Sequence, residues 1–105
     1  MSDQTIEDQI VAKGLTAPRI SLAHVQKMKE RLEYLFERCP GKTTTFCHVY
    51  LDGTFYLATG VSACVSPENF DSQVGIDVAR TKAEALATDK LYELEGYRLW
   101  SELNQ

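Results

Sequence analysis

Cys64, in the stretch SACVSPENFD, is the side chain of this sequence best suited to act as a nucleophile. Ser66 and Pro67 follow it and predict a helix start, because serine caps helix N-termini and proline fits the first turn. A thiol aimed at such an N-terminus gains thiolate character, and His48 or His24 could then act as its base. A lone cysteine with two scattered histidines matches no nucleophile signature, however, and free cysteines usually behave as small buried hydrophobes. We therefore predict no catalytic residue.

A zinc site is the second chemistry that the residue types allow. The candidate ligands are Cys39, Cys47, His48 and Cys64. Structural zinc motifs bring their ligands in close pairs such as C-x2-C, and neighbouring residues of a strand point to opposite faces, so this spacing does not suit a metal. We predict no metal and no cofactor, and we expect the three cysteines to be free thiols.

An anion-binding pocket is the third possibility. The N-terminus of the predicted helix presents free backbone N–H groups, to which Ser66 and Asn69 could add side-chain contacts. Arg19, Lys42 or Arg80 could supply the positive charge. A simple helix cap also explains Ser66, so the sequence leaves the pocket and the cap as alternatives. The sequence has no Gly-rich phosphate loop and no H-E-x-x-H motif.

Length and composition predict one globular domain over residues 1–105. Hydrophobic residues make up 44% and charged residues 25%, and the formal net charge is −4. A net acidic chain is a poor general nucleic-acid binder, and the mixed charges over residues 24–42 are typical of a solvated face. The N-terminus has no signal-like segment and nothing later resembles a membrane span, so we expect a cytosolic protein with no membrane partner.

Helical periodicity predicts two helices in the first third of the chain. A short helix is expected over residues 3–13, ending at Gly14, and it forms a lead-in over residues 1–14 to a core over residues 15–105. A second helix is expected over residues 21–38, with Ser21 as its N-cap. The apolar side of this second helix is made of Leu22, Val25, Met28, Leu32, Leu35 and Phe36.

A β-hairpin is predicted after these helices, with Asp52-Gly53 as a two-residue turn. In this register Leu51 faces Thr54. One face then carries Phe46, His48, Tyr50, Phe55, Leu57 and Val61, and the other carries Cys47, Val49, Leu51, Tyr56 and Ala58. We expect His48 to be a core or cross-strand residue with a satisfied ring nitrogen.

Both hairpin faces are largely apolar, and this predicts a homodimer. One face can be covered by helices of the same chain, but a two-stranded hairpin leaves its other face and its edges unpaired. We expect a second subunit to cover the remaining surface. The interface residues expected in this arrangement are Cys47, Val49, Leu51 and Tyr56.

A long helix is predicted over residues 67–94, with alanines that allow a close approach to its neighbour. The following YRLWSEL is expected to form a short strand or helical turn, with Tyr97, Leu99 and Trp100 folded back on the core. The fold class is therefore α+β. We expect a helix, a two-stranded antiparallel hairpin and a long C-terminal helix packed on the hairpin.

Several motifs of this chain together resemble a family of small tailed-phage proteins. They are GLTAPRIS at 14–21, FC at 46–47, SACVSPENFDSQVG at 62–75 with the DVARTKA that follows, and LEGYRL at 94–99. The family is typified by the gene 49 product of coliphage N-four and a gene 66 product of a Shigella podophage, and the resemblance spans residues 14–103. It implies a phage or prophage origin and expression in the bacterial host cytoplasm, and it offers no catalytic residues.

The function expected from these observations is binding. Our first hypothesis is a phage accessory protein that binds a host protein during infection or host takeover. The second is a sponge for an anionic nucleotide signal, held at helix N-termini by Ser66 and Asn69. A minor virion component is the third, and an enzyme is the least favoured.

Overall fold

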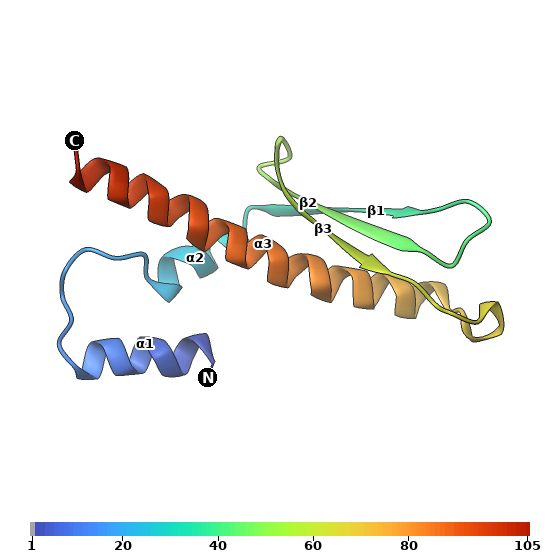
Figure 1. The fold of residues 1–105 in the computed structure, drawn as a ribbon, viewed down its shortest axis with the longest axis horizontal. Helices are drawn as coiled ribbons and strands as arrows, with labels where there is room; N and C mark the ends of the chain where they lie inside the picture. The colour runs from blue at the N-terminus through green and yellow to red at the C-terminus, as the bar shows by residue number, and fades with distance from the viewer. Residues whose placement is uncertain (1) are drawn as a thin grey trace.

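Three antiparallel strands and one long helix form the body of the molecule in the computed structural model, which describes residues 2–105. Strands β1 (Leu32–Arg38), β2 (Thr45–Leu51) and β3 (Phe55–Ser62) lie side by side in that order. Helix α3 (Ser72–Leu103) crosses one face of the sheet and runs on beyond its end (Figure 1). The predicted α+β class, with a long C-terminal helix on the strands, is confirmed.

The prediction of one helix over residues 21–38 is wrong in its second half. Helix α2 (Leu22–Lys29) begins at the predicted N-cap, where the Ser21 side chain accepts a hydrogen bond from the His24 N–H. Its helical hydrogen bonding ends at residue 29, and strand β1 follows. The sheet consequently has three strands instead of the two predicted. The β1 side chains that alternate toward the core are Leu32, Tyr34 and Phe36.

The predicted turn at Asp52-Gly53 is present, but the register that follows differs from the prediction. Both turn residues have positive φ, 54° for Asp52 and 74° for Gly53, as a tight hairpin turn requires. Leu51 is then paired with Phe55 instead of with residue 54. The first pair beyond the turn is therefore already shifted by one residue.

A β-bulge in β3 shifts the register a second time. Tyr50 is paired with Tyr56 but Val49 with Ala58, so Leu57 has no partner across the strand pair. Such an extra residue bends the strand and re-aims the side chains near it. The shift at the turn puts Leu57 in the core and Tyr56 on the opposite face, which reverses the faces predicted for these two residues, and the bulge then returns Ala58 to its predicted face.

Helix α3 begins and ends later than the predicted range 67–94. Residues Pro67–Asn69 form only a single 3-10 turn, and the cap of α3 is Asp71, whose side chain accepts a hydrogen bond from the Val74 N–H. The helix then continues through Gly96 to Leu103. Tyr97 and Trp100 consequently point outward at its end instead of folding back on the core.

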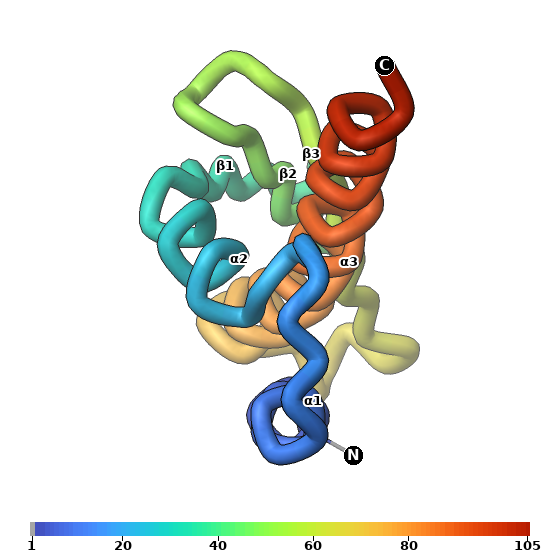
Figure 2. The backbone as a smooth tube through the Cα atoms, turned by 90° about the vertical axis from the view of Figure 1, so that its left-hand side faces the viewer, coloured from blue at the N-terminus to red at the C-terminus, as the bar shows by residue number. Residues whose placement is uncertain are grey.

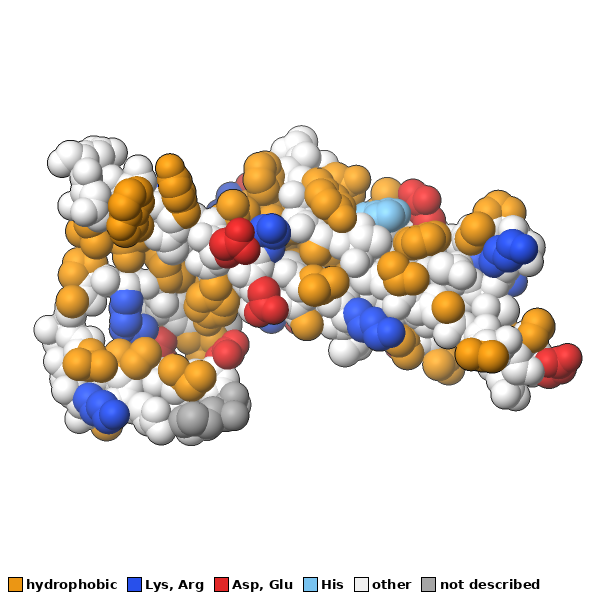
Figure 3. Space-filling view, in the orientation of Figure 1, with side chains coloured by type: hydrophobic (Ala, Val, Ile, Leu, Met, Phe, Trp, Pro, Cys, Tyr) orange, Lys and Arg blue, Asp and Glu red, His pale blue; other side chains and the backbone are white. Residues whose placement is uncertain are grey.

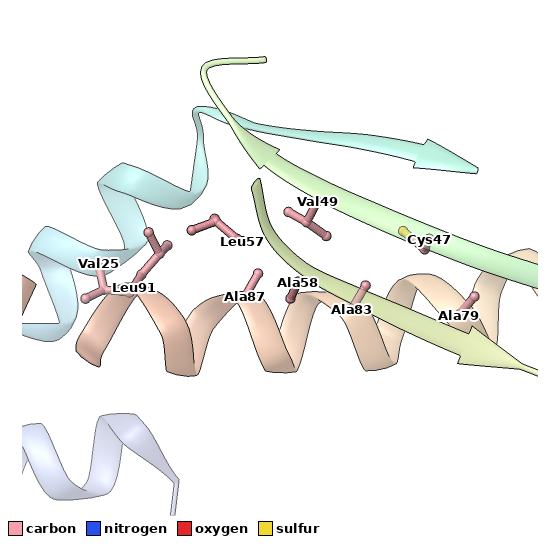
Figure 4. Packing of buried hydrophobic residues seen from close by; sticks show 9 residues of the cluster. All are labelled: Val25, Cys47, Val49, Leu57, Ala58, Ala79, Ala83, Ala87 and Leu91. Carbon is pink, nitrogen blue, oxygen red and sulfur yellow. The ribbon is translucent and has the colours of Figure 1, made fainter. Parts of the chain in front are cut away.

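Small side chains let α3 lie very close to the sheet. Ala79, Ala83, Ala87 and Leu91 recur every fourth residue on the side of α3 that faces the strands (Figure 4). Opposite them lies Gly60, where an added Cβ would be only 2.3 Å from the Ala79 carbonyl oxygen. The buried hydrophobic core of the described residues consists of Val25, Cys47, Val49, Leu57, Ala58, Ala79, Ala83, Ala87 and Leu91.

Helix α1 (Asp3–Ala12) confirms the short helix predicted near the N-terminus, and it stands apart from the sheet (Figure 2). None of its ten residues is buried. The Glu7 carboxylate fixes it to the rest of the chain by accepting hydrogen bonds from the Arg19 guanidinium and from the Leu22 N–H. The molecule is elongated, with principal extents of 54 × 29 × 19 Å, because the 32-residue helix α3 runs along its length.

Candidate protein-binding surfaces

One side of the sheet is covered by α3, and the other side is open. Side chains alternate between the two sides along each strand, and the register brings the open ones into rows across the sheet. We call this the open sheet face; it consists of Leu35, Phe46, His48, Tyr50, Tyr56, Thr59 and Val61. Its exposed members include Leu35, Tyr56 and Val61, which are 49%, 52% and 42% exposed. The open sheet face is therefore both apolar and accessible.

A chain of polar contacts crosses the middle of the open sheet face. The Glu37 carboxylate lies 3.5 Å from His48 Nε2, and His48 Nδ1 lies 2.8 Å from the Thr59 hydroxyl. That hydroxyl is in turn 2.7 Å from the Tyr56 hydroxyl. The prediction that His48 is a cross-strand residue with a satisfied ring nitrogen is confirmed. Each of the four polar side chains in this row of contacts therefore has a partner among the other three.

A second apolar surface lies on α3 beyond the end of the sheet. Its members recur every third residue and form one ridge along the helix. We call it the C-terminal ridge; it consists of Leu94, Tyr97, Trp100 and Leu103. Tyr97 and Trp100 are each 61% exposed, and their rings pack 6.0 Å apart. Hydrophobic side chains gather at this end of the molecule as well as over the sheet (Figure 3).

Ion pairs hold the opposite flank of this helical end. Glu95 lies 2.6 Å from His24 Nε2 of α2, and Arg98 donates hydrogen bonds to Glu95 and to Glu102. The hydrogen bond with His24, and then those with Arg98, hold the pKa of the Glu95 carboxyl below its usual value, against the opposing effect of its partial burial. The C-terminal ridge therefore lies on a segment of α3 whose opposite side contacts α2.

The predicted interface residues lie on two different faces of the sheet. Cys47 and Val49 are fully buried beneath α3 of the same chain, and burial raises the pKa of the Cys47 thiol. Leu51 packs against the same core. Tyr56 is the member of the predicted set that lies on the open sheet face. The surface left for a partner is therefore opposite the one predicted.

The two polar residues of the predicted anion pocket lie near the 3-10 turn instead of at the N-terminus of a long helix. The Ser66 hydroxyl donates a hydrogen bond to the Glu68 carboxylate, and this bond holds the pKa of Glu68 low. Asn69 lines a hollow of about 250 Å³ beside Cys64. Asp71 is also among the residues that line this hollow, and an acidic residue there is unfavourable to an anion.

The three basic residues proposed for that pocket are dispersed over the molecule. Arg19 is paired with Glu7 of α1, and the Arg80 guanidinium stacks over the Tyr34 ring at 4.5 Å. Lys42 is exposed in the loop between β1 and β2. The hollow beside residue 64 has none of these three cations in its lining. The structure does not bring the five predicted residues together.

Cys64 lies two residues beyond the end of β3 and is half-buried. Its thiol donates a hydrogen bond to the Ser66 carbonyl oxygen at 3.1 Å. His24 and His48 are engaged elsewhere, with Glu95 and with the polar chain of the open sheet face. Among residues 2–105, no group of three or more His, Cys, Asp or Glu side chains is placed to hold a metal ion.

These features define a small α+β protein with a three-stranded antiparallel sheet, one long helix and two exposed apolar surfaces. Residues 2–103 match the model of the phage protein (N4 Gp49/phage Sf6 gene 66) family. The chain belongs to this family and is a phage protein, as its motifs led us to expect. No curated protein and no solved structure matches it. None of the helices over residues 2–105 is long and apolar enough to cross a membrane.

Proposed function

We propose that this phage protein acts by binding a protein of its bacterial host, and that the C-terminal ridge is the binding surface. The observation that carries the proposal is the exposure of Tyr97 and Trp100 side by side on a braced helix. Tryptophan and tyrosine dominate the binding energy of protein interfaces, because they bury a large area at little cost in conformational entropy.

The geometry favours recognition of the ridge by a groove. An amphipathic helix can place its apolar ridge in a hydrophobic groove of a partner, with anchors spaced three or four residues apart. Here the helix is formed before binding, since α2 and the Glu95–Arg98–Glu102 ion pairs support it. Less ordering is then needed when the partner binds, which strengthens the complex.

The charges beside the ridge define the chemistry of the partner. Residues 89–105 carry four acidic side chains against two basic ones. A partner that fits this surface has an apolar groove with a basic rim, because like charges opposed across an interface weaken binding.

Affinity purification of the tagged full chain from phage-infected bacteria tests the proposal. We expect a host protein to be recovered with the wild-type chain and with Val65→Ala, a control that shortens a fully exposed side chain away from the ridge. The double substitution Tyr97→Ala and Trp100→Ala should lose that protein, since each hot-spot aromatic contributes about 2 kcal/mol or more. Recovery of virion proteins alone, or equal recovery by all three chains, would contradict the proposal.

A further inference from the structure

The chain exposes more surface than a compact monomer of its size. Its accessible surface is 7237 Å², whereas a folded monomer of 11.8 kDa is expected to expose about 5,900 Å². Its radius of gyration is 17.3 Å, against about 13 Å for a compact domain of this length. Part of the excess of about 1,300 Å² belongs to α1 and to the end of α3 beyond the sheet, and the total is larger than the roughly 800 Å² that each partner contributes to a standard interface.

The core of the chain is small in proportion to this surface. It contains nine buried hydrophobic residues, and four of them are alanines. A chain that buries so little of its apolar surface gains stability when a partner covers the rest. A second copy of the same chain is present whenever the protein folds. A host target need not be present at that time.

From these observations we infer that the protein is a homodimer in which the open sheet faces of two copies pack on each other. The inference concerns the sheet, and it does not depend on the role proposed for the C-terminal ridge. Two antiparallel sheets commonly pack face to face, with the side chains of both inner faces interdigitating. The apolar residues of the open sheet face, namely Leu35, Phe46, Tyr50, Tyr56 and Val61, would then form the second core of the molecule.

The polar chain in the middle of the open sheet face is compatible with this burial. A buried polar group is costly when it has no hydrogen-bond partner. The His48, Thr59 and Tyr56 side chains already contact one another, and Glu37 closes the chain at the edge of the sheet. Covering this face therefore leaves these groups with partners, without any contribution from the second copy.

The charges at the two edges of the open sheet face select one arrangement. Glu33 and Glu37 lie along the β1 edge, and the Lys82 ammonium lies at the β3 edge, where it donates to the Val61 carbonyl oxygen at 3.3 Å. A two-fold axis parallel to the strands places β1 of one copy over β3 of the other. Glu37 and Lys82 belong to the same row across the sheet, so this axis brings Glu37 of each copy toward the partner's Lys82. A two-fold axis across the strands would instead oppose carboxylates.

Sedimentation equilibrium of the full chain over a concentration series tests the inference. We expect twice the monomer mass for the wild type. Leu35→Glu and Val61→Glu, which place an unpaired charge in the face, should each raise the dissociation constant about 100-fold or more. Val65→Glu is the matched control, because Val65 is fully exposed outside the face, and its dissociation constant should stay that of the wild type. Circular dichroism of each variant establishes that it is folded.

A charge exchange tests the arrangement without introducing charge into the centre of the face. Glu37→Lys and Lys82→Glu should each raise the dissociation constant about tenfold, and the double variant should bind more tightly than Glu37→Lys alone, with full recovery prevented by the loss of the carboxylate that contacts His48. A wild-type chain of monomer mass at every concentration would overturn the inference. So would a dimer that Leu35→Glu and Val61→Glu leave intact, and failure of the double variant to bind more tightly than Glu37→Lys would overturn the proposed pairing of β1 with β3.

Discussion

Gly60 of β3 lies directly beneath α3, and no side chain fits between them. An added Cβ would lie 2.3 Å from the Ala79 carbonyl oxygen and 2.4 Å from the Ala83 nitrogen, both of which belong to the helix backbone. The backbone of a helix or a strand has to move to relieve such contacts. We therefore predict that Gly60→Ala lowers the free energy of unfolding by about 3 kcal/mol or more, as measured by urea denaturation at fixed chain concentration.

Gly96 provides the matched control for this substitution. It lies within α3 and has nothing within 4 Å of an added Cβ. Alanine favours the helix by about 1 kcal/mol relative to glycine, so Gly96→Ala should leave stability unchanged or raise it. If Gly60→Ala were as well tolerated as Gly96→Ala, the close packing of α3 on β3 would be wrong.

Glu95 gives a pH dependence with a defined sign. Its folded-state pKa is lowered from an ordinary value of 4.5, mainly by the hydrogen bond with His24, so its ionised form stabilises the fold. This contribution is complete above about pH 4.5 and is lost as the pH falls through the folded-state pKa. We predict that Glu95→Gln lowers the free energy of unfolding by about 1 kcal/mol at pH 7. The effect is small because the partner side chain, His24, is partly exposed.

The measurement for Glu95 is urea unfolding of both chains from pH 7 down to pH 3. The difference between wild type and Glu95→Gln should shrink below pH 4.5. Glu93→Gln should behave as the wild type at every pH, because the ion pair of Glu93 with Lys90 is long and exposed and contributes little to stability. A difference that grew as the pH fell below 4.5 would have the wrong sign for a lowered pKa of Glu95.

Helix α1 is the element with the weakest attachment to the rest of the chain. The Glu7 carboxylate of α1 accepts hydrogen bonds from Arg19 and from the Leu22 N–H. None of the residues of α1 is buried. We predict that Glu7→Ala frees α1, so that the amides of residues 6–12 exchange with solvent faster while those of the sheet keep their protection. Hydrogen–deuterium exchange with mass spectrometry measures both regions in one experiment.

Asp8→Ala is the control for this prediction. It removes the same charge from the same helix, but the Asp8 carboxylate contacts only Gln4 of α1 in the hydrogen bonds of the described chain. Exchange over residues 6–12 should therefore change little in this variant. Equal exchange in Glu7→Ala and in the wild type would mean that other contacts hold α1 in place.

The second half of the predicted helix over 21–38 is where local pattern was least informative. The segment LEYLFER has Leu32, Leu35 and Phe36 at helical spacing, but Leu32, Tyr34 and Phe36 also alternate as a strand requires. Tertiary contacts decide between helix and strand for this segment. As a strand it pairs with β2 and packs three side chains on the core. The clear signals, namely Ser21, the Asp52-Gly53 turn and the alanine repeat, all predicted real features.

The candidate surfaces were predictable only in part. The alternation along β2 correctly separates Phe46, His48 and Tyr50 from Cys47 and Val49, but it does not say which of the two faces α3 covers. The extra loop residue between Leu51 and Phe55 reverses the predicted faces of β3 near the turn, and neither this residue nor the bulge at residue 57 is encoded in a local motif. The C-terminal ridge was missed, although the spacing of three residues from Leu94 to Leu103 indicates it.

At the scale of the whole molecule, two apolar surfaces at different places suggest two separate partners. The open sheet face suits a second copy, and the C-terminal ridge, which runs from Leu94 to Leu103 of α3, suits a host protein. If both proposals hold, the dimer presents two ridges and can bind two copies of its target. A target that itself carries two linked grooves would then bind both ridges with a gain in effective concentration.

Trp100 allows the most direct test of the proposal that the open sheet face binds a second copy and the C-terminal ridge binds a host protein. It is the only tryptophan of the chain, and it lies in the C-terminal ridge. Its fluorescence emission should remain that of a solvent-exposed indole as dilution takes the protein from dimer to monomer, and it should shift to the blue when the captured host protein is added. A blue shift on dimerisation, or no shift on binding the host protein, would contradict the account.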